Sequence, residues 1–119
     1  MDEIKQIVDC MNSIVEKKAV NIIREEFAKR GLKVFKIILF GSRAKGEAKE
    51  DSDWDFLIIV SKKLNFNEKW SIIDNIKVKL AQLKLPNDIF IKSSAEVEES
   101  KEDVGRITYY AIKEGIEIK

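Results

Sequence analysis

The chain has 119 residues, of which 45% are apolar and 36% are charged, with no histidine and a single cysteine, Cys10. These counts exclude a Ser-His-Asp triad, a Cys-His pair, a histidine-ligated zinc site and an internal disulfide. Lysine and arginine total 22 and aspartate and glutamate total 21, so the net charge of +1 predicts no extended nucleic-acid surface. Any catalysis must use carboxylates, hydroxyl groups, amines, guanidinium groups and backbone amides.

The length suits one domain, and we expect residues 1–119 to form it. No apolar run approaches the ~20 residues that cross a bilayer. The first ten residues, MDEIKQIVDC, carry too many charges for a secretory signal. We therefore expect a cytoplasmic protein that does not enter a membrane.

Apolar residues recur every three or four positions over residues 2–30, which predicts one long amphipathic helix, or two helices with a bend near Lys17–Lys18. We expect Cys10 to be buried as a small apolar residue beside this stripe. If the stripe exceeds what a sheet can cover, the helix is a candidate surface for a homodimer or another partner.

Two apolar segments predict buried strands. KVFKIILF at 33–40 has a nearly continuous apolar end, which is typical of a central strand. The polar, glycine-containing segment GSRAKGEAKEDSD follows as a loop, and WDFLIIV at 54–60 predicts the second strand.

The remaining elements follow from cap signals and periodicity. Asn65 and Glu68 have capping-box spacing and predict a helix from 66 to about 83. DIFI at 88–91 predicts a short third strand, and residues 116–118 an extended end. Ser93 with Glu96, and Ser100 with Asp103, predict two further helix starts. One face of the 66–83 helix is expected to pack on the sheet through Phe66, Trp70, Ile73, the stem of Lys77, and Leu80.

The order of these elements is helix, strand, loop, strand, helix, strand, helix. It predicts an α/β (α+β) domain with a small sheet flanked by helices.

Gly41 and Ser42 directly follow the first strand. A glycine there lets backbone amides approach a ligand, and these amides with the Ser42 hydroxyl can hold phosphate oxygens. On its own, the dipeptide is more simply explained as a turn with a serine helix cap.

Asp53 and Asp55 lie two positions apart at the start of the second strand, so both side chains project from the same face of the sheet. Adjacent carboxylates repel unless a cation lies between them, and Mg²⁺ prefers oxygen ligands. Asp88 is a candidate third carboxylate if the third strand lies beside the second. The plainer interpretations are a solvated acidic strand end for the pair and a strand-start residue for Asp88.

Gly41-Ser42, ten intervening residues and Asp53-x-Asp55 together resemble the signature of the polymerase-β-like nucleotidyltransferase superfamily. The segments FGSRAKGEAKEDSDWD and YYAIKEGIEI are similar to its minimal nucleotidyltransferase (MNT) branch. The resemblance implies a palm-like fold with a small mixed sheet. It implies catalytic, Mg²⁺-binding roles for Asp53, Asp55 and Asp88, with two ions. It also implies nucleotide-binding roles for Gly41, Ser42 and Arg43.

The resemblance also implies a function. MNT proteins are commonly paired with helical HEPN proteins as antitoxin and toxin, and can move AMP from ATP to a tyrosine of the toxin. We therefore expect an ATP-dependent protein adenylyltransferase that acts as an antitoxin. One alternative is a non-catalytic antitoxin that neutralises its partner by occlusion. A weaker one is nucleotidyl transfer to a small molecule or an RNA end, against which the lack of room for a recognition domain counts.

Overall fold

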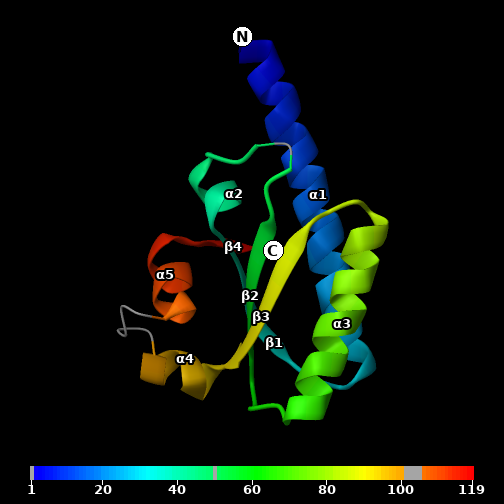
Figure 1. The fold of residues 1–119 in the computed structure, drawn as a ribbon, viewed down its shortest axis with the longest axis vertical. Coiled ribbons are helices and arrows are strands. Elements are labelled where there is room, and N and C mark those ends of the chain that lie inside the picture. The colour runs from blue at the N-terminus through cyan, green and yellow to red at the C-terminus, as the bar shows by residue number, and fades with distance from the viewer. Residues whose placement is uncertain (1, 50, 101–105) are drawn as a thin grey trace.

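The computed structural model describes residues 2–49, 51–100 and 106–119 (Figure 1). Within these ranges, four strands form one mixed sheet in the order β3-β2-β1-β4. β1 pairs antiparallel with β2 and β4, whereas β2 and β3 run parallel. The elements are α1 (Asp2–Lys29), β1 (Val34–Phe40), α2 (Ser42–Lys45), β2 (Trp54–Val60), α3 (Phe66–Gln82), β3 (Asn87–Ser93), α4 (Ser94–Ser100), α5 (Ile107–Glu114) and β4 (Ile116–Ile118).

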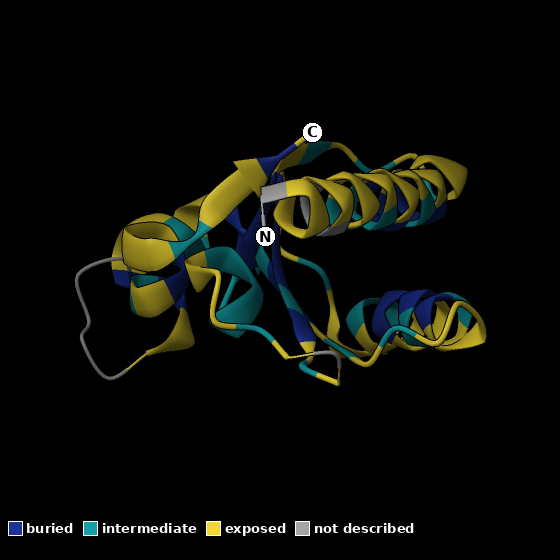
Figure 2. Ribbon diagram, turned by 90° about the horizontal axis from the view of Figure 1, so that it is seen from above, coloured by how far each residue is buried: buried dark blue, intermediate teal, exposed yellow. Residues whose placement is uncertain are grey.

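Helices cover both faces of the sheet, as the sequence predicts. Figure 2 shows α1 and α3 on one side, with α4 and α5 on the other. The continuous apolar run of β2 follows from this arrangement, because alternate side chains enter different cores. Trp54, Phe56 and Ile58 belong to the core beneath α1 and α3, and Leu57 and Ile59 belong to the smaller core beneath α4 and α5.

The predicted cap of α3 is present, but its predicted buried face is partly wrong. The Asn65 side chain accepts a hydrogen bond of 2.8 Å from the Glu68 N–H. Phe66 and Trp70 are 75% and 47% exposed, and their rings contact each other at 6.1 Å between centroids. Trp70 lies roughly 100° around the helix from the mean direction of the buried residues, so it turns away from the sheet. Those buried residues are Ile72, Ile73, Ile76 and Leu80.

Ser93 and Glu96 form the predicted cap of α4 in both directions. The Glu96 N–H donates to Ser93 Oγ at 3.2 Å, and the Ser93 N–H donates to Glu96 Oε1 at 3.1 Å. The other predicted start, Ser100 with Asp103, includes Asp103, which lies outside the described residues. The extended end at 116–118 is β4, which adds to the sheet beside β1.

α1 is one helix of 28 residues, without the alternative division near Lys17–Lys18. At 1.5 Å per residue it spans roughly 42 Å, whereas a seven-residue strand spans roughly 23 Å. Its N-terminal half therefore projects past the sheet (Figure 1). The prediction that Cys10 is buried is wrong, because Cys10 lies on this projecting half and is exposed. No described helix is both long enough and apolar enough to cross a membrane.

A buried carboxylate joins α1 to α3. The Glu26 side chain is 1% exposed, yet its Oε1 accepts hydrogen bonds from Asn75 Nδ2 at 2.9 Å and Arg30 Nε at 3.2 Å. Its Oε2 lies 3.0 Å from Lys29 Nζ. Burial by itself raises the pKa of Glu26, but the hydrogen bonds from Asn75, Lys29 and Arg30 outweigh it and hold that pKa below its ordinary value.

Replacing Glu26 with glutamine is expected to destabilise the protein. A lowered pKa stabilises the fold above the ordinary glutamate pKa of 4.5, and this contribution is lost as the pH falls through the lowered value. Glu26→Gln should therefore reduce the free energy of unfolding by about 2 kcal/mol at neutral pH, and by less in acid. Urea unfolding of Glu26→Gln and of the exposed neighbour control Glu25→Gln measures this. A loss of unfolding free energy that does not depend on pH, or an equal loss in the control, contradicts the stabilising role of the Glu26 charge.

Candidate active site

The structure brings the three predicted aspartates together. Asp53 immediately precedes β2, Asp55 lies in β2 and Asp88 lies in β3. The parallel register pairs Asp55 with Asp88, so both side chains leave the same face of the sheet. Each aspartate offers an oxygen, and these oxygens lie within 4.8 Å of one another. The condition for Asp88 to join the pair, that the third strand lies beside the second, is met.

Burial and neighbouring charges raise the pKa of one member of the cluster, Asp55. Burial, followed by the charges of Asp88 and Asp53, raises the pKa of Asp55 from 3.8 to about 6, while Lys77 acts in the opposite direction. Asp55 is half-buried, and the other two aspartates are exposed. A bound cation would remove the repulsion, and three carboxylates offer the hard oxygen ligands that Mg²⁺ prefers. The donor set therefore fits this ion.

Lys77 is a neighbour of the cluster that the sequence did not reveal. Its Nζ donates to the Asn87 carbonyl oxygen at 2.8 Å and lies 3.6 Å from Asp88 Oδ1. The sequence predicts only that the aliphatic stem of Lys77 packs on the sheet, from one face of the helix. The available signal was a lysine within an apolar helix stripe, because such a side chain buries its stem and extends its amine past the core.

Gly41 is in direct contact with the aspartate cluster. Its φ of 76° and ψ of −157° lie in a region that other residues rarely adopt. A Cβ atom at this position would also overlap Asp55 Oδ2. The backbone conformation and the lack of space beside Asp55 therefore each require glycine at this position, and the loop lies against the carboxylate.

Gly41, and not Ser42, stands at the cap of α2, and Arg43 holds the loop that follows. Gly41 itself occupies the cap position of α2 and makes no side-chain cap bond, so the interpretation of Ser42 as a helix cap is wrong. The Arg43 guanidinium donates to the Ser52 carbonyl oxygen from Nε at 3.2 Å and from Nη2 at 2.9 Å. It also lies 4.5 Å from the centre of the Trp54 ring. These contacts hold the loop closed, and nucleotide binding by Arg43 stays a prediction.

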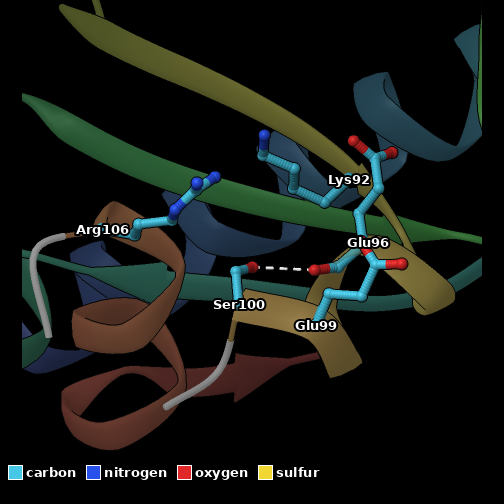
Figure 3. A pocket seen from close by; sticks show the side chains of 5 residues that line it. All are labelled: Lys92, Glu96, Glu99, Ser100 and Arg106. Carbon is cyan, nitrogen blue, oxygen red and sulfur yellow. Dashed lines mark hydrogen bonds between the residues drawn. The ribbon is translucent and has the colours of Figure 1, made fainter. Parts of the chain in front are cut away.

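A hollow of about 150 Å³ lies near the opposite end of β3 (Figure 3). Lys92 in its wall is four residues beyond Asp88, roughly 13 Å along the strand. Two wall residues already serve α4: Glu96 caps it, and Ser100 Oγ donates to the Glu96 carbonyl oxygen at 2.7 Å. The hollow is therefore separate from the aspartate cluster. Its lining residues are Lys92, Glu96, Glu99, Ser100 and Arg106.

Residues 20–113 match the family model of the nucleotidyltransferase domain, a range that includes the Gly41–Ser42 turn and all three aspartates. The chain belongs to this family. The resemblance inferred from the sequence motif is thereby confirmed at the level of the family. No curated protein matches the chain.

Several solved structures that are similar in fold to this nucleotidyltransferase come from toxin–antitoxin complexes. One is a crystal structure of a toxin–antitoxin with AMP-PNP, with 20% identity, a TM-score of 0.57, and coverage of 86% of this chain and 70% of that one. Another is tri-AMPylated Shewanella oneidensis HEPN toxin in complex with MNT antitoxin, with 18% identity, a TM-score of 0.52, and coverage of 87% and 68%. At these identities the likeness concerns the fold, and it confirms the predicted fold class.

Replacing Gly41 with alanine is expected to destabilise the fold more than the matched change at Gly46. Both glycines have positive φ values, but a Cβ at Gly46 meets nothing within 4 Å. Gly46→Ala should reduce the free energy of unfolding by about 1 kcal/mol, and Gly41→Ala by about 3 kcal/mol, because it also displaces the Asp55 carboxylate. Urea unfolding compares the two variants, and equal losses contradict the contact with Asp55.

Replacing Asp55 with asparagine is expected to stabilise the metal-free protein at high pH. Its pKa is raised from 3.8 to about 6, so wild-type stability falls as the pH rises through this range. Asp55→Asn should gain about 1 kcal/mol at pH ~8, allowing for solvent screening, and nothing at pH ~3. The control is Asp51→Asn, an exposed carboxylate in the loop that precedes β2. A variant that is less stable than wild type at high pH in the presence of a chelator contradicts the raised pKa of Asp55.

Proposed function

We propose that this chain is a Mg²⁺-dependent nucleotidyltransferase that moves AMP from ATP to a tyrosine hydroxyl of a HEPN-type protein and is that protein's antitoxin. The observation that carries the proposal is the convergence of Asp53, Asp55 and Asp88 against the Gly41 turn. Membership of the nucleotidyltransferase family supports the class of reaction. The AMPylated HEPN toxin in one structural neighbour supports the choice of acceptor.

The three aspartates are the proposed metal ligands, with room for two Mg²⁺ ions if substrate phosphates and water complete their coordination. Asp53, just before β2, and Asp55, within β2, would supply ligands from one side, and Asp88 would supply the third carboxylate from β3. Bound there, Mg²⁺ would neutralise charge on the triphosphate and lower the pKa of the acceptor hydroxyl.

The loop is the proposed phosphate-binding element. The first N–H groups of α2 have no acceptor within the helix, and the absence of a side chain at Gly41 leaves the turn open to close approach. Together with the Ser42 hydroxyl, these groups would donate to phosphate oxygens. Arg43 would contribute positive charge beside them while its guanidinium holds the loop through Ser52.

Asp88, an exposed carboxylate of the cluster, is the proposed proton acceptor. The acceptor oxygen would form a bond to the α-phosphorus of ATP as the bond from that phosphorus to the bridging oxygen breaks. The hydroxyl proton would pass to the Asp88 carboxylate, and pyrophosphate would leave.

One observation favours the second candidate, a non-catalytic antitoxin. Lys77 Nζ already stands 3.6 Å from Asp88 Oδ1, so a protein cation partly neutralises the third carboxylate. In that case the aspartates would serve the fold or the interface, and the chain would inhibit its partner by covering it.

Replacing Asp53 with asparagine is expected to abolish transfer. With ATP labelled at the α-phosphate and a cognate HEPN-type protein, Asp53→Asn should reduce labelling of the partner by more than about 100-fold, because a metal ligand is lost. Asp51→Asn, which changes an exposed carboxylate outside the cluster, should label the partner normally. Undiminished labelling by Asp53→Asn would overturn the metal assignment.

The same variants separate transfer from occlusion. An Asp53→Ala/Asp55→Ala double variant that folds but no longer neutralises the partner supports transfer. Full neutralisation by that variant supports occlusion.

A further inference from the structure

The projecting half of α1 carries an apolar face that nothing described in the chain covers. Large aliphatic side chains in a domain of this size are usually buried. Here four of them follow one another along the helix with at least half of their surface in contact with solvent. They are Ile4 (65% exposed), Ile7 (60%), Met11 (60%) and Ile14 (50%).

This projecting face is not a continuation of the face that packs on the sheet. At 100° per residue, the mean direction of the four exposed side chains lies roughly 140° around the helix from that of the buried ones. The chain's own sheet therefore could not cover both faces even if it were longer. The buried residues of α1 are Ala19, Val20, Ile23, Glu26 and Phe27.

The spacing of the exposed residues is that of two packed helices. Positions 4, 7, 11 and 14 alternate steps of three and four, which is the seam of a coiled coil. Glu3, Cys10 and Lys17 recur at steps of seven along one flank of this seam, and all three are exposed. Among the described residues, neither Glu3 nor Lys17 forms an ion pair.

The flank is complementary to itself. When two such helices pack antiparallel, Ile4 lies level with Ile14 of the second copy and Ile7 with Met11. The flanking residues then bring Glu3 near Lys17 twice and Cys10 near Cys10 beside the two-fold axis, each pair offset by roughly 3 Å along the helices. Opposite charges thus meet at both ends of the seam. A parallel pair would instead leave these charges at opposite ends.

We propose that the chain forms a two-fold symmetric dimer in which the projecting halves of α1 from two copies pack antiparallel. The overlap from Glu3 to Lys17 is roughly 21 Å long. The two globular bodies lie at opposite ends of this overlap, because each body begins where α1 reaches its sheet (Figure 1). An interface of this length is small, so the dimer forms and dissociates with concentration. It does not depend on the proposed function, since each copy holds a complete aspartate cluster.

The first test is the oligomeric state of the full chain. Sedimentation across concentrations from about 1 µM to about 1 mM should show a monomer–dimer equilibrium. Ile7→Lys should raise its dissociation constant by at least about tenfold, because a charge replaces an apolar contact made twice. Val78→Lys, which changes a 57% exposed residue on α3, should leave it unchanged. A monomer at every concentration, or equal effects of both variants, overturns the proposal.

The second test uses the two flanking charges. Glu3→Lys and Lys17→Glu should each weaken the dimer by about threefold or more, and the double variant should restore the wild-type dissociation constant. A short bismaleimide should join two wild-type chains through Cys10, and Ile7→Lys should lose this cross-link. If the double variant is weaker than either single one, the antiparallel arrangement is wrong. If Ile7→Lys loses only binding to a HEPN-type protein, the face belongs to that partner instead.

Discussion

This fold has to hold three acidic side chains within a few ångströms of one another. The oxygens of Asp53, Asp55 and Asp88 lie within 4.8 Å of one another, and no local preference of the chain would hold them there against their repulsion. The parallel pairing of β2 with β3 holds them, and that pairing is stabilised by burial of β2 on both faces. Hydrophobic burial thus offsets an electrostatic cost at the end of the same strand.

Glu26 and Asp55 show that neighbouring groups decide whether the pKa of a carboxyl group is lowered or raised. Glu26 is more deeply buried than Asp55, yet its pKa is lowered because Asn75, Lys29 and Arg30 surround it with donors and positive charge. The pKa of Asp55 is raised because burial is joined by two further carboxylates. The fold supplies its own cations where a carboxylate has a structural role. It leaves the aspartate cluster short of positive charge, which is the condition that favours a metal ion.

The two halves of α1 present two different apolar faces. Its C-terminal half closes the core over the sheet, and its N-terminal half extends beyond the domain with a separate apolar face. A continuous helix is a rigid way to hold such a face away from the body. The aspartate cluster and this face lie on different elements, so the proposed catalysis and the proposed association do not share residues.

The sequence by itself determined the elements and the local part of the site. Periodicity and caps predicted the longer helices and the strands, but not the short helix α2 inside the expected loop. They also predicted that Asp53 and Asp55, two residues apart at the start of the second strand, share a face. Only the tertiary structure decided that Asp88 lies beside Asp55, that Lys77 reaches Asp88, and that Cys10 is exposed. The physical reason is that periodicity and caps act over a few residues. Strand neighbours, the reach of a long side chain, and the overshoot of a helix past its sheet depend instead on how distant segments pack.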